Sequence, residues 1–173
     1  AFDAKTGTER WRVTRDEQTT WSTPVVVEDA GRALVIVSAS GKTRAYDLKT
    51  GAEAWSCGGL GANAIPTPVA DRETVFVMSG YQEPAGLAIR YTGAKGDLTG
   101  TPAVAWKIDR GTSYVPSPLL LDGKLYFVER FRAVLSRYDL KTGQQHYTDQ
   151  RIEGLENIYA SPVGADGRIY IVD

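Results

Sequence analysis

The stretch AYDLKTGAEAW, residues 45–55, reads as a strand, a tight turn and a second strand that ends on a tryptophan. Nearly the same string opens the chain as AFDAKTGTERW, residues 1–11, and a third version, RYDLKTGQQHY, occupies residues 137–147. A catalytic motif normally occurs once in an active site, whereas a motif that recurs at intervals indicates a structural unit. The recurrence therefore predicts a repeat architecture.

Two independent markers keep the same period along the chain. The aromatic residue that closes the motif recurs at spacings of 44, 51 and 41 residues, and a Ser/Thr-Pro pair that precedes an apolar run recurs at spacings of 44, 50 and 44. The closing aromatics are Trp11, Trp55, Trp106 and Tyr147, and the prolines are Pro24, Pro68, Pro118 and Pro162. These markers divide the chain into repeats 22–65, 66–115 and 116–159, with partial repeats 1–21 and 160–173.

Each repeat contains four short segments with the features of strands. Alternating runs such as KLYFV and RIYIV have the period of two that strands require, and no segment has a helical stripe. The turns LDGK and ADGR carry Asp-Gly, which accepts the positive φ values of a two-residue hairpin. Proline cannot donate to a sheet, so each Ser/Thr-Pro belongs at the start of a strand. We expect an all-β fold, a β-propeller of four-stranded antiparallel blades, with about four blades' worth of strands.

Composition excludes several classes of function. The chain has 173 residues and a formal net charge of −1, so it has no overall field that would attract nucleic acid or an anionic membrane. No apolar run reaches the roughly 18 residues that span a bilayer. Cys57 and His146 are the only residues of their kinds, which excludes an internal disulfide and a cysteine-based zinc site. We expect Cys57 to be an idle, buried thiol and His146 to be a partly exposed strand residue.

The pattern AxDxxTGxxxW resembles the tryptophan-docking motif of the quinoprotein, or PQQ-type, propeller repeats. Two copies match at every fixed position, the last keeps its Asp, Thr and Gly with Tyr147 in place of tryptophan, and the copy in residues 90–106 keeps only Trp106 beside a longer insertion. The matching residues are Ala1, Asp3, Thr6, Gly7, Trp11, Ala45, Asp47, Thr50, Gly51, Trp55, Trp106, Asp139, Thr142, Gly143 and Tyr147.

The resemblance implies a structural role for these residues. In the family, each indole packs against the alanine and the Thr-Gly peptide of a neighbouring blade, where glycine lets the two backbones approach closely. An indole buries roughly 150 to 250 Å², which at about 25 cal/mol per Å² corresponds to about 4 to 6 kcal/mol of gross transfer free energy per contact. The motif therefore predicts a clasp between blades rather than a catalytic site.

The same family includes enzymes, and their site is the alternative. Its dehydrogenases hold PQQ with a calcium or lanthanide ion on Glu, Asn and Asp side chains and cover it with a disulfide between adjacent cysteines. This chain has one cysteine, and its only asparagines, Asn63 and Asn157, lie in loops before Ser/Thr-Pro pairs. We expect a non-enzymatic scaffold with no cofactor. The alternative is a piece of a PQQ-dependent alcohol dehydrogenase whose PQQ and Ca²⁺ site lies largely outside this chain.

A scaffold would bind through the loops that join one blade to the next, which gather on one face of a propeller. Exposed aromatics beside charged and amide side chains suit a protein or peptide partner. The candidate contact residues are Trp21, Arg110, Tyr114, Asn157 and Tyr159. The alternative is that Trp21 and Tyr159 only plug the mouth of the channel. The resemblance further implies a periplasmic or secreted bacterial protein. The balanced charge predicts no nucleic-acid partner, and the lack of a long apolar run predicts no insertion into a membrane.

The chain begins inside the third strand of one repeat and ends after the second strand of another. The terminal halves therefore pair either into a composite fourth blade of a small ring, or with further blades as about half of a larger ring. We favour the second arrangement because the family's rings are mostly eight-bladed. A homodimer that completes the ring is a further expectation, since exposed blade edges invite pairing.

Overall fold

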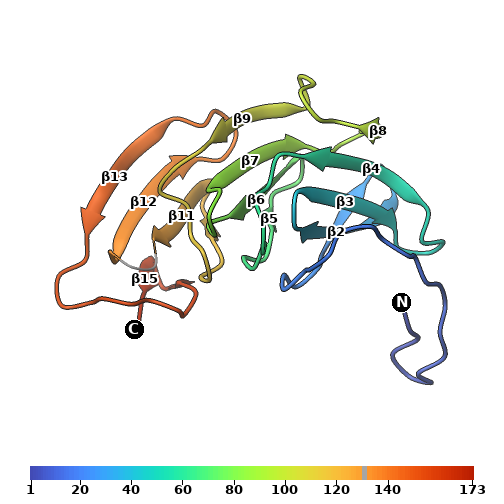
Figure 1. Cartoon of the computed structure of the whole chain (residues 1–173), viewed down its shortest axis with the longest axis horizontal. Helices are drawn as coiled ribbons and strands as arrows, with labels where there is room; N and C mark the ends of the chain where they lie inside the picture. Colours follow the sequence, from blue (N-terminus) through green and yellow to red (C-terminus); the bar gives the residue numbers. More distant parts are fainter. Residues whose placement is uncertain (130–131) are drawn as a thin grey trace.

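The computed structural model is an open arc of β-sheets (Figure 1). It describes residues 1–129 and 132–173, without the side chains of residues 148 and 149. No helix occurs in this described part of the chain. Three sheets follow one another along the arc, and each contains four antiparallel strands in sequence order. The predicted all-β class and four-stranded units are therefore confirmed. Residues 130–131 of repeat 116–159 lie outside the described residues.

Each sheet corresponds to one complete repeat and is called a blade. Blade 1 contains β1 (Val25–Asp29), β2 (Arg32–Ala39), β3 (Lys42–Asp47) and β4 (Glu53–Gly58). Blade 2 contains β5 (Val69–Ala70), β6 (Thr74–Ser79), β7 (Ala85–Arg90) and β9 (Val104–Ile108). Blade 3 contains β10 (Leu119–Leu121), β11 (Lys124–Glu129), β12 (Val134–Asp139) and β13 (Gln145–Arg151). The remaining pair is β14 (Val163–Ala165) with β15 (Arg168–Tyr170).

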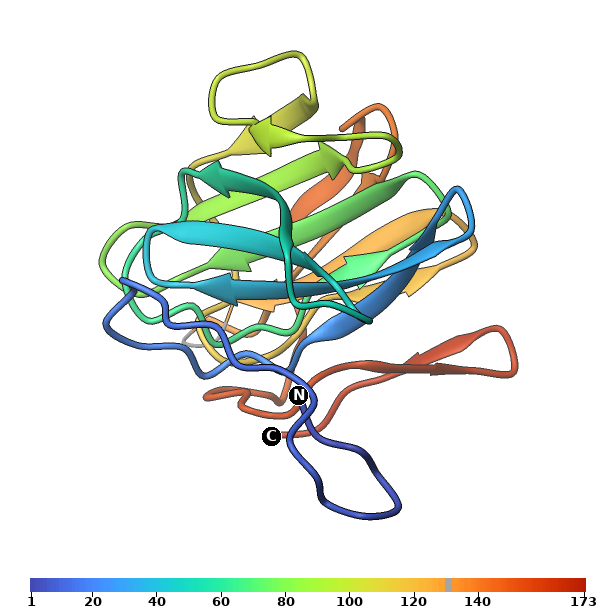
Figure 2. The ribbon, with the colours of Figure 1, turned by 90° about the vertical axis from the view of Figure 1, so that its right-hand side faces the viewer.

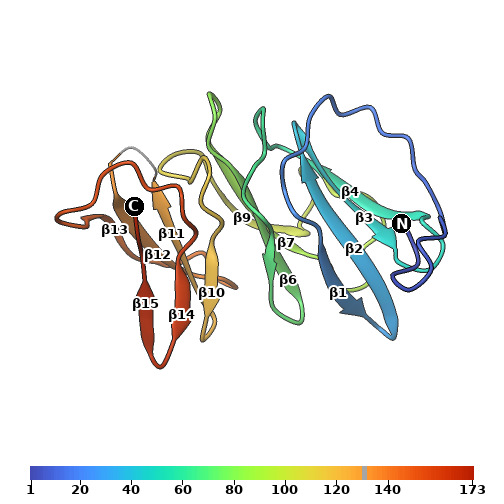
Figure 3. The same ribbon diagram turned by 90° about the horizontal axis from the view of Figure 1, so that it is seen from below.

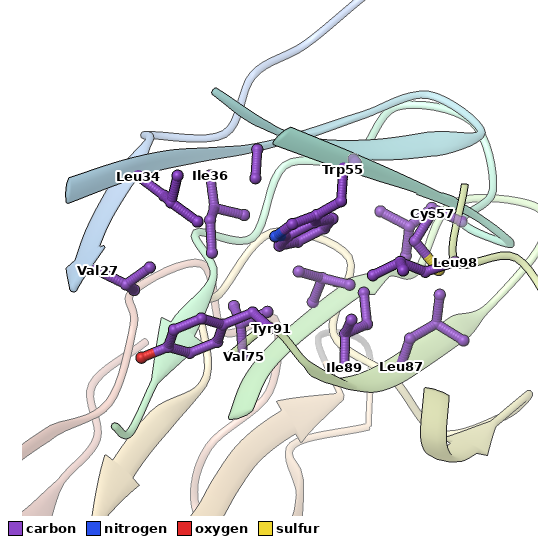
Figure 4. Packing of buried hydrophobic residues seen from close by; sticks show 14 residues of the cluster. Val27, Leu34, Ile36, Trp55, Cys57, Val75, Leu87, Ile89, Tyr91 and Leu98 are labelled. Carbon is purple, nitrogen blue, oxygen red and sulfur yellow. The ribbon is translucent and has the colours of Figure 1, made fainter. Parts of the chain in front are cut away.

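Successive side chains of a strand point to opposite faces of its sheet, and apolar side chains lie on both faces of the blades. In β6, Val75 and Val77 face blade 1, whereas Phe76 and Met78 belong to the cluster shared with blade 3. Figure 4 shows the core between blades 1 and 2, where the fully buried Trp55 lies among the aliphatic side chains of both sheets. A strand buried on both faces reads as a continuous apolar run, which explains the uninterrupted TVFVM of β6.

The hairpins between the first two strands of a blade are the tight turns expected from Asp-Gly. Asp122 and Gly123 have φ values of 50° and 70°, and Asp166 and Gly167 have 49° and 66°. Ala30 and Gly31, in the looser sequence DAGR, have 51° and 81°. Positive φ at both central residues matches the right-handed twist of the flanking strands.

The two ends of the chain lie at opposite ends of the arc (Figures 1 and 3). Residues 1–11 form a hairpin rather than the two regular strands that the sequence predicts, with one isolated bridge between Phe2 and Glu9. At the other end β14 pairs only with β15. No ladder joins these two ends within the described residues, so the chain contains three complete blades and two half-blades. Whether it is a whole domain or half of one stays a prediction.

The insertion in residues 91–103 forms a short strand that the sequence did not predict. Its strand β8 (Gly96–Asp97) pairs in parallel with β4 and adds a fifth strand to blade 1. Figure 2 shows this segment crossing above the outer edges of the blades. The Gly58 amide donates to Thr99 Oγ1 at 2.8 Å, which fixes the end of the added strand. The insertion therefore covers the outer edge of blade 1 that an ordinary turn would leave open.

Candidate functional site

The regular motif turn is held together by its aspartate. Asp47 Oδ1 accepts from the amides of Lys49 and Thr50 at 3.0 and 2.9 Å and from the Thr50 hydroxyl at 3.0 Å. These hydrogen bonds to the ionised carboxylate, led by the Thr50 amide, lower the pKa of Asp47. Gly51 follows with a φ of 76°, where a side chain would be strained.

The regular turns at residues 47–51 and 139–143 each receive the tryptophan of the preceding repeat. Trp11 Nε1 donates to the Leu48 carbonyl at 2.9 Å, and Trp106 Nε1 donates to the Leu140 carbonyl at 2.7 Å. A Cβ built on Gly51 would lie 2.7 Å from the Trp11 ring. The glycine is thus required both for its backbone conformation and for the close approach of the indole.

Trp55 lacks such a turn because the motif of the following repeat is degraded. Its ring is completely buried, and its Nε1 has no hydrogen-bond partner. The insertion supplies apolar contacts instead, through the buried Tyr91 and Leu98 of the same cluster (Figure 4). Tyr91 is fixed by its hydroxyl, which donates to the Asp71 carbonyl at 2.8 Å. The Trp55 indole therefore joins the two repeats by packing, without a hydrogen bond of its own.

The loop face of the molecule is formed by the links between blades, residues 12–24, 59–68, 109–118 and 152–162, together with the turns at 40–41 and 80–84. The five residues predicted to contact a partner all lie in these links. Trp21 is 67% exposed and Tyr159 is 53% exposed, and Arg110 and Asn157 are also exposed. Trp21 lies in the first link and Tyr159 in the last, so the five residues are spread over successive links, here called the strip, and are not gathered in one pocket.

Within the strip, Tyr114 is held in place by its neighbours. Its ring is stacked on Tyr81, with centroids 5.2 Å apart. The link beneath it is anchored, because the buried Thr112 hydroxyl donates to the Ser79 carbonyl at 2.7 Å and the Ser113 hydroxyl donates to the Val128 carbonyl. A Cβ on Gly80 would collide with the Ser113 carbonyl, so this turn and the link pack backbone to backbone. The aromatic pair is therefore held on a rigid support.

A hollow of about 350 Å³ lies beside Arg110. Glu129, Arg132 and Gln145 contribute to its lining, and Arg132 lies 3.7 Å from Glu129. The mixture of positive charge, negative charge and amide suits hydrogen bonding to a peptide more than burial of an apolar ligand.

Arg44 forms a cluster with three carboxylates near this face. Its guanidinium contacts Asp16 and Glu17 from the first link and Glu53 from β4, the last at 2.6 Å. Hydrogen bonds from Arg44 to Glu17 and Glu53 raise the pKa of the guanidinium. The cluster joins residues 16–17 to blade 1 and borders a hollow of about 420 Å³ lined by Lys42 and Glu83.

The residues weighed for the PQQ-dependent alternative lie in separate surroundings. Within residues 1–129 and 132–173, no three or more His, Cys, Asp and Glu side chains are grouped so that they could hold a metal ion. The backbone N–H of Asn63 donates to Ser40 Oγ at 3.0 Å, which holds this loop on the turn at residues 40–41. Cys57 is fully buried, and burial raises its pKa to about 11; His146 is exposed on β13.

Sequence reasoning missed Tyr81 and Arg44. Tyr81 lies in the irregular sequence SGYQEP between β6 and β7, where the repeat gives no aligned position, and only its aromatic character in a Gly-Pro turn was a signal. Arg44 precedes the motif, and its three carboxylate partners are 9 to 28 residues away in sequence. No spacing rule predicts such a cluster.

Comparison with known proteins identifies a family for this chain and a solved structure with a similar fold. A sequence model described as outer membrane protein assembly factor BamB matches residues 1–173. A search of the curated proteins finds no relative. Among solved structures, BamB from Moraxella catarrhalis is similar, with a TM-score of 0.61 and 18% sequence identity over 97% of this chain. The chain spans about half of that protein, since the match covers 50% of it. The described residues contain no helix that is long and apolar enough to cross a membrane.

Proposed function

Because the chain belongs to the PQQ-like repeat family described as outer membrane protein assembly factor BamB, we propose that it is a non-enzymatic scaffold that binds a protein or peptide. Its place is the bacterial cell envelope or the secreted space. The family description names a protein assembly factor, which favours a macromolecular partner over a small substrate.

The observation that carries the proposal is the aromatic strip on the loop face. Trp21 and Tyr159 expose more than half of their surfaces, and Tyr114 with Tyr81 presents a stacked pair between them. Tyrosine and tryptophan supply large contact areas at a low cost in conformational entropy, and they dominate the energetics of protein interfaces. Arg110 and Asn157 add donors and an acceptor beside these rings.

Selection of peptides from a random display library on the folded chain tests this proposal. Selected peptides should bind the unmodified chain and lose about tenfold or more in affinity for the variants Trp21→Ala, Tyr114→Ala and Tyr159→Ala. Leu48→Ala is the control, because Leu48 is an exposed apolar residue in the motif turn after β3, at the other end of this strand from the turn at residues 40–41. Equal binding to all variants, with unchanged melting temperatures, would show that the loop face does not bind the peptides.

The proposal includes no cofactor, and this part has its own test. Titration with PQQ in the presence of Ca²⁺, followed by absorbance and by an alcohol-oxidation assay, should give no saturable binding and no turnover. Tight binding of PQQ would instead favour a dehydrogenase whose site is shared with further blades.

A further inference from the structure

One position in the third strand of each blade carries a different kind of side chain in each repeat. Counted through the strand pairing from the proline that opens each blade, Arg44 of β3, Leu87 of β7 and Ser136 of β12 occupy the same register position. Each lies on the face of its blade toward the preceding repeat. The groups that surround these three side chains can therefore be compared directly.

In blade 1 the space beside Arg44 is filled by ionised groups of the chain itself. Asp16 and Glu17 of the first link contact the guanidinium, and Glu53 of β4 contacts it at 2.6 Å. The Arg44 side chain is 15% exposed and that of Glu17 only 6%. A hollow of about 420 Å³, called the first hollow, borders this cluster.

In blade 2 the space beside Leu87 is filled by apolar packing. Leu87 is 5% exposed and belongs to the core between blades 1 and 2. The link after blade 1 lies against it, because a Cβ built on Gly59 would be 3.4 Å from Leu87 Cδ1. A hollow of about 410 Å³, called the second hollow, lies beside this contact.

In blade 3 the equivalent groups are smaller or uncharged. Ser136 is buried, but its side chain is only a hydroxymethyl group. Gln145 holds the position of Glu53, because each lies opposite the tyrosine of its motif. Ser136 and Gln145 are both on the wall of the hollow of about 350 Å³ beside Arg110, called the third hollow.

The link before blade 3 is also shorter than the first link. Thr20 in the first link and Ser113 in this one donate their hydroxyl hydrogens to equivalent strand carbonyls. Thr20 follows the closing tryptophan of its repeat by nine positions, whereas Ser113 follows it by seven. The shorter link places Arg110 and Gly111 on the wall of the third hollow. A Cβ built on Gly111 would meet no atom within 4 Å, so this wall faces open space.

The third hollow also differs from the other two in charge. Its lining contains two guanidinium groups, Arg110 and Arg132, and one carboxylate, Glu129. Arg132 lies 3.7 Å from Glu129, and Arg110 forms no ion pair with any side chain that the structure describes. The linings of the first and second hollows contain more acidic than basic side chains. Of the three, only the third hollow therefore favours an anionic group.

We propose that the third hollow binds a carboxylate group of the partner, with Arg110 as the residue that contacts it; this rests on the proposed function as a peptide-binding scaffold. A guanidinium group binds a carboxylate through two parallel hydrogen bonds. The partner thus completes in blade 3 the pairing of guanidinium and carboxylate that blade 1 makes within the chain. Tyr114 lies four positions after Arg110 in the same link, so a peptide on the stacked tyrosines can place an acidic residue in the hollow.

Small probes test the site before a partner is known. N-acetylglutamate α-amide carries one side-chain carboxylate, and its glutamine analogue has the same shape without the charge. In ¹H–¹⁵N spectra the glutamate probe should shift the Gly111 amide signal saturably, and the glutamine analogue should not. N-acetylglycine carries only a terminal carboxylate, so comparison of the two carboxylate probes shows whether a side chain or a chain end binds more tightly. Saturable binding of either one supports the site.

Two variants remove the site in different ways. Arg110→Gln removes an exposed cation, and Ser136→Leu fills the hollow with the side chain that blade 2 has at this position. Both should abolish the saturable shift. Arg72→Gln is the control for the same loss of charge, because Arg72 is exposed in the turn between β5 and β6. A shift that persists in Arg110→Gln, or that the glutamine analogue produces equally, would overturn the proposal.

Peptides selected on the folded chain separate this site from the proposed function. Replacing the acidic residue of a selected peptide by its amide should weaken binding to the unmodified chain about tenfold and leave binding to Arg110→Gln unchanged. Peptides that require Trp21 and Tyr114 but no acidic residue would overturn the site and leave the proposed function in place. A saturable shift of Gly111 without any selected peptide would support the site and count against the proposed function.

Discussion

Trp106 lies directly on Gly143 of the next repeat, so closely that a Cβ on this glycine would be 2.6 Å from Cγ of the indole. The same indole donates its N–H to the Leu140 carbonyl at 2.7 Å. The pair therefore joins blade 2 to blade 3 through close packing and through one partly buried hydrogen bond. The free energy that this contact contributes to folding can be measured by comparing alanine variants of two glycines of the chain.

Gly143→Ala should destabilise the chain by about 3 kcal/mol, because it combines the cost of a left-handed backbone with a collision against the indole. Gly123→Ala is the control, since Gly123 has the same φ of 70° and no neighbour within 4 Å of its Cβ. It should cost only about 1 kcal/mol. Urea denaturation measures both, and equal losses would show that the contact with Trp106 contributes nothing.

The three motif tryptophans should differ in their indole N–H resonances. Trp11 and Trp106 donate to carbonyl groups, whereas Trp55 Nε1 is buried without an acceptor. In a ¹H–¹⁵N spectrum the Trp55 proton should therefore lie upfield of the other two, because a hydrogen bond to a carbonyl moves an amide-type proton downfield. Tryptophan-to-phenylalanine variants assign the signals. A Trp55 proton as far downfield as that of Trp106 would contradict the missing acceptor.

The fold was predictable because its signals are local and repeated. Asp-Gly turns, Ser/Thr-Pro strand starts and period-two apolar runs each determine a few residues, and the repeat places them in register. The position of Gly51 beside an indole followed from the motif of the family. The predicted links do form the loop face, but their aromatic side chains form a strip, because the open arc spreads the links apart.

Other features were not predictable because they depend on contacts between segments distant in sequence. The parallel pairing of β8 with β4 joins residues about 40 positions apart, from different repeats. Neither Gly96 nor Asp97 has the apolar alternation that indicates a strand, and backbone pairing alone places them there. The orphan N–H of Trp55 follows from the same insertion, since a regular turn would have offered a carbonyl.

Asp139 should make the stability of the chain sensitive to acid. The hydrogen bond from the Lys124 ammonium and that from the Thr142 amide hold the pKa of Asp139 well below its usual range. A carboxylate whose pKa is lowered by folding stabilises the folded state above its unfolded pKa of about 3.9, and this stabilisation is lost as pH falls toward the folded value.

Asp139→Asn should therefore destabilise the chain most above about pH 5, and the difference from the unmodified chain should shrink as pH falls toward about 2. Lys124→Met removes the main cause of the lowered pKa and should reduce the same pH dependence. Urea midpoints measured across this range give the profile. A difference that stays constant with pH would show that Asp139 acts only through the geometry of its turn.

Arg44 should hold the first link on blade 1. Its side chain is 15% exposed, and that of its partner Glu17 is only 6% exposed, so Arg44→Ala leaves a buried carboxylate without its cation. Breaking such a pair from one side costs about 3 kcal/mol, whereas exposed pairs contribute about 0 to 1 kcal/mol. Arg12→Ala is the matched control, because Arg12 pairs with Glu9 on the surface at 2.6 Å. Limited trypsin digestion separates a local effect on the link from global unfolding. Release of residues 1–15 should be faster in Arg44→Ala and unchanged in Arg12→Ala. Equal rates in the two variants would show that the cluster does not anchor the link.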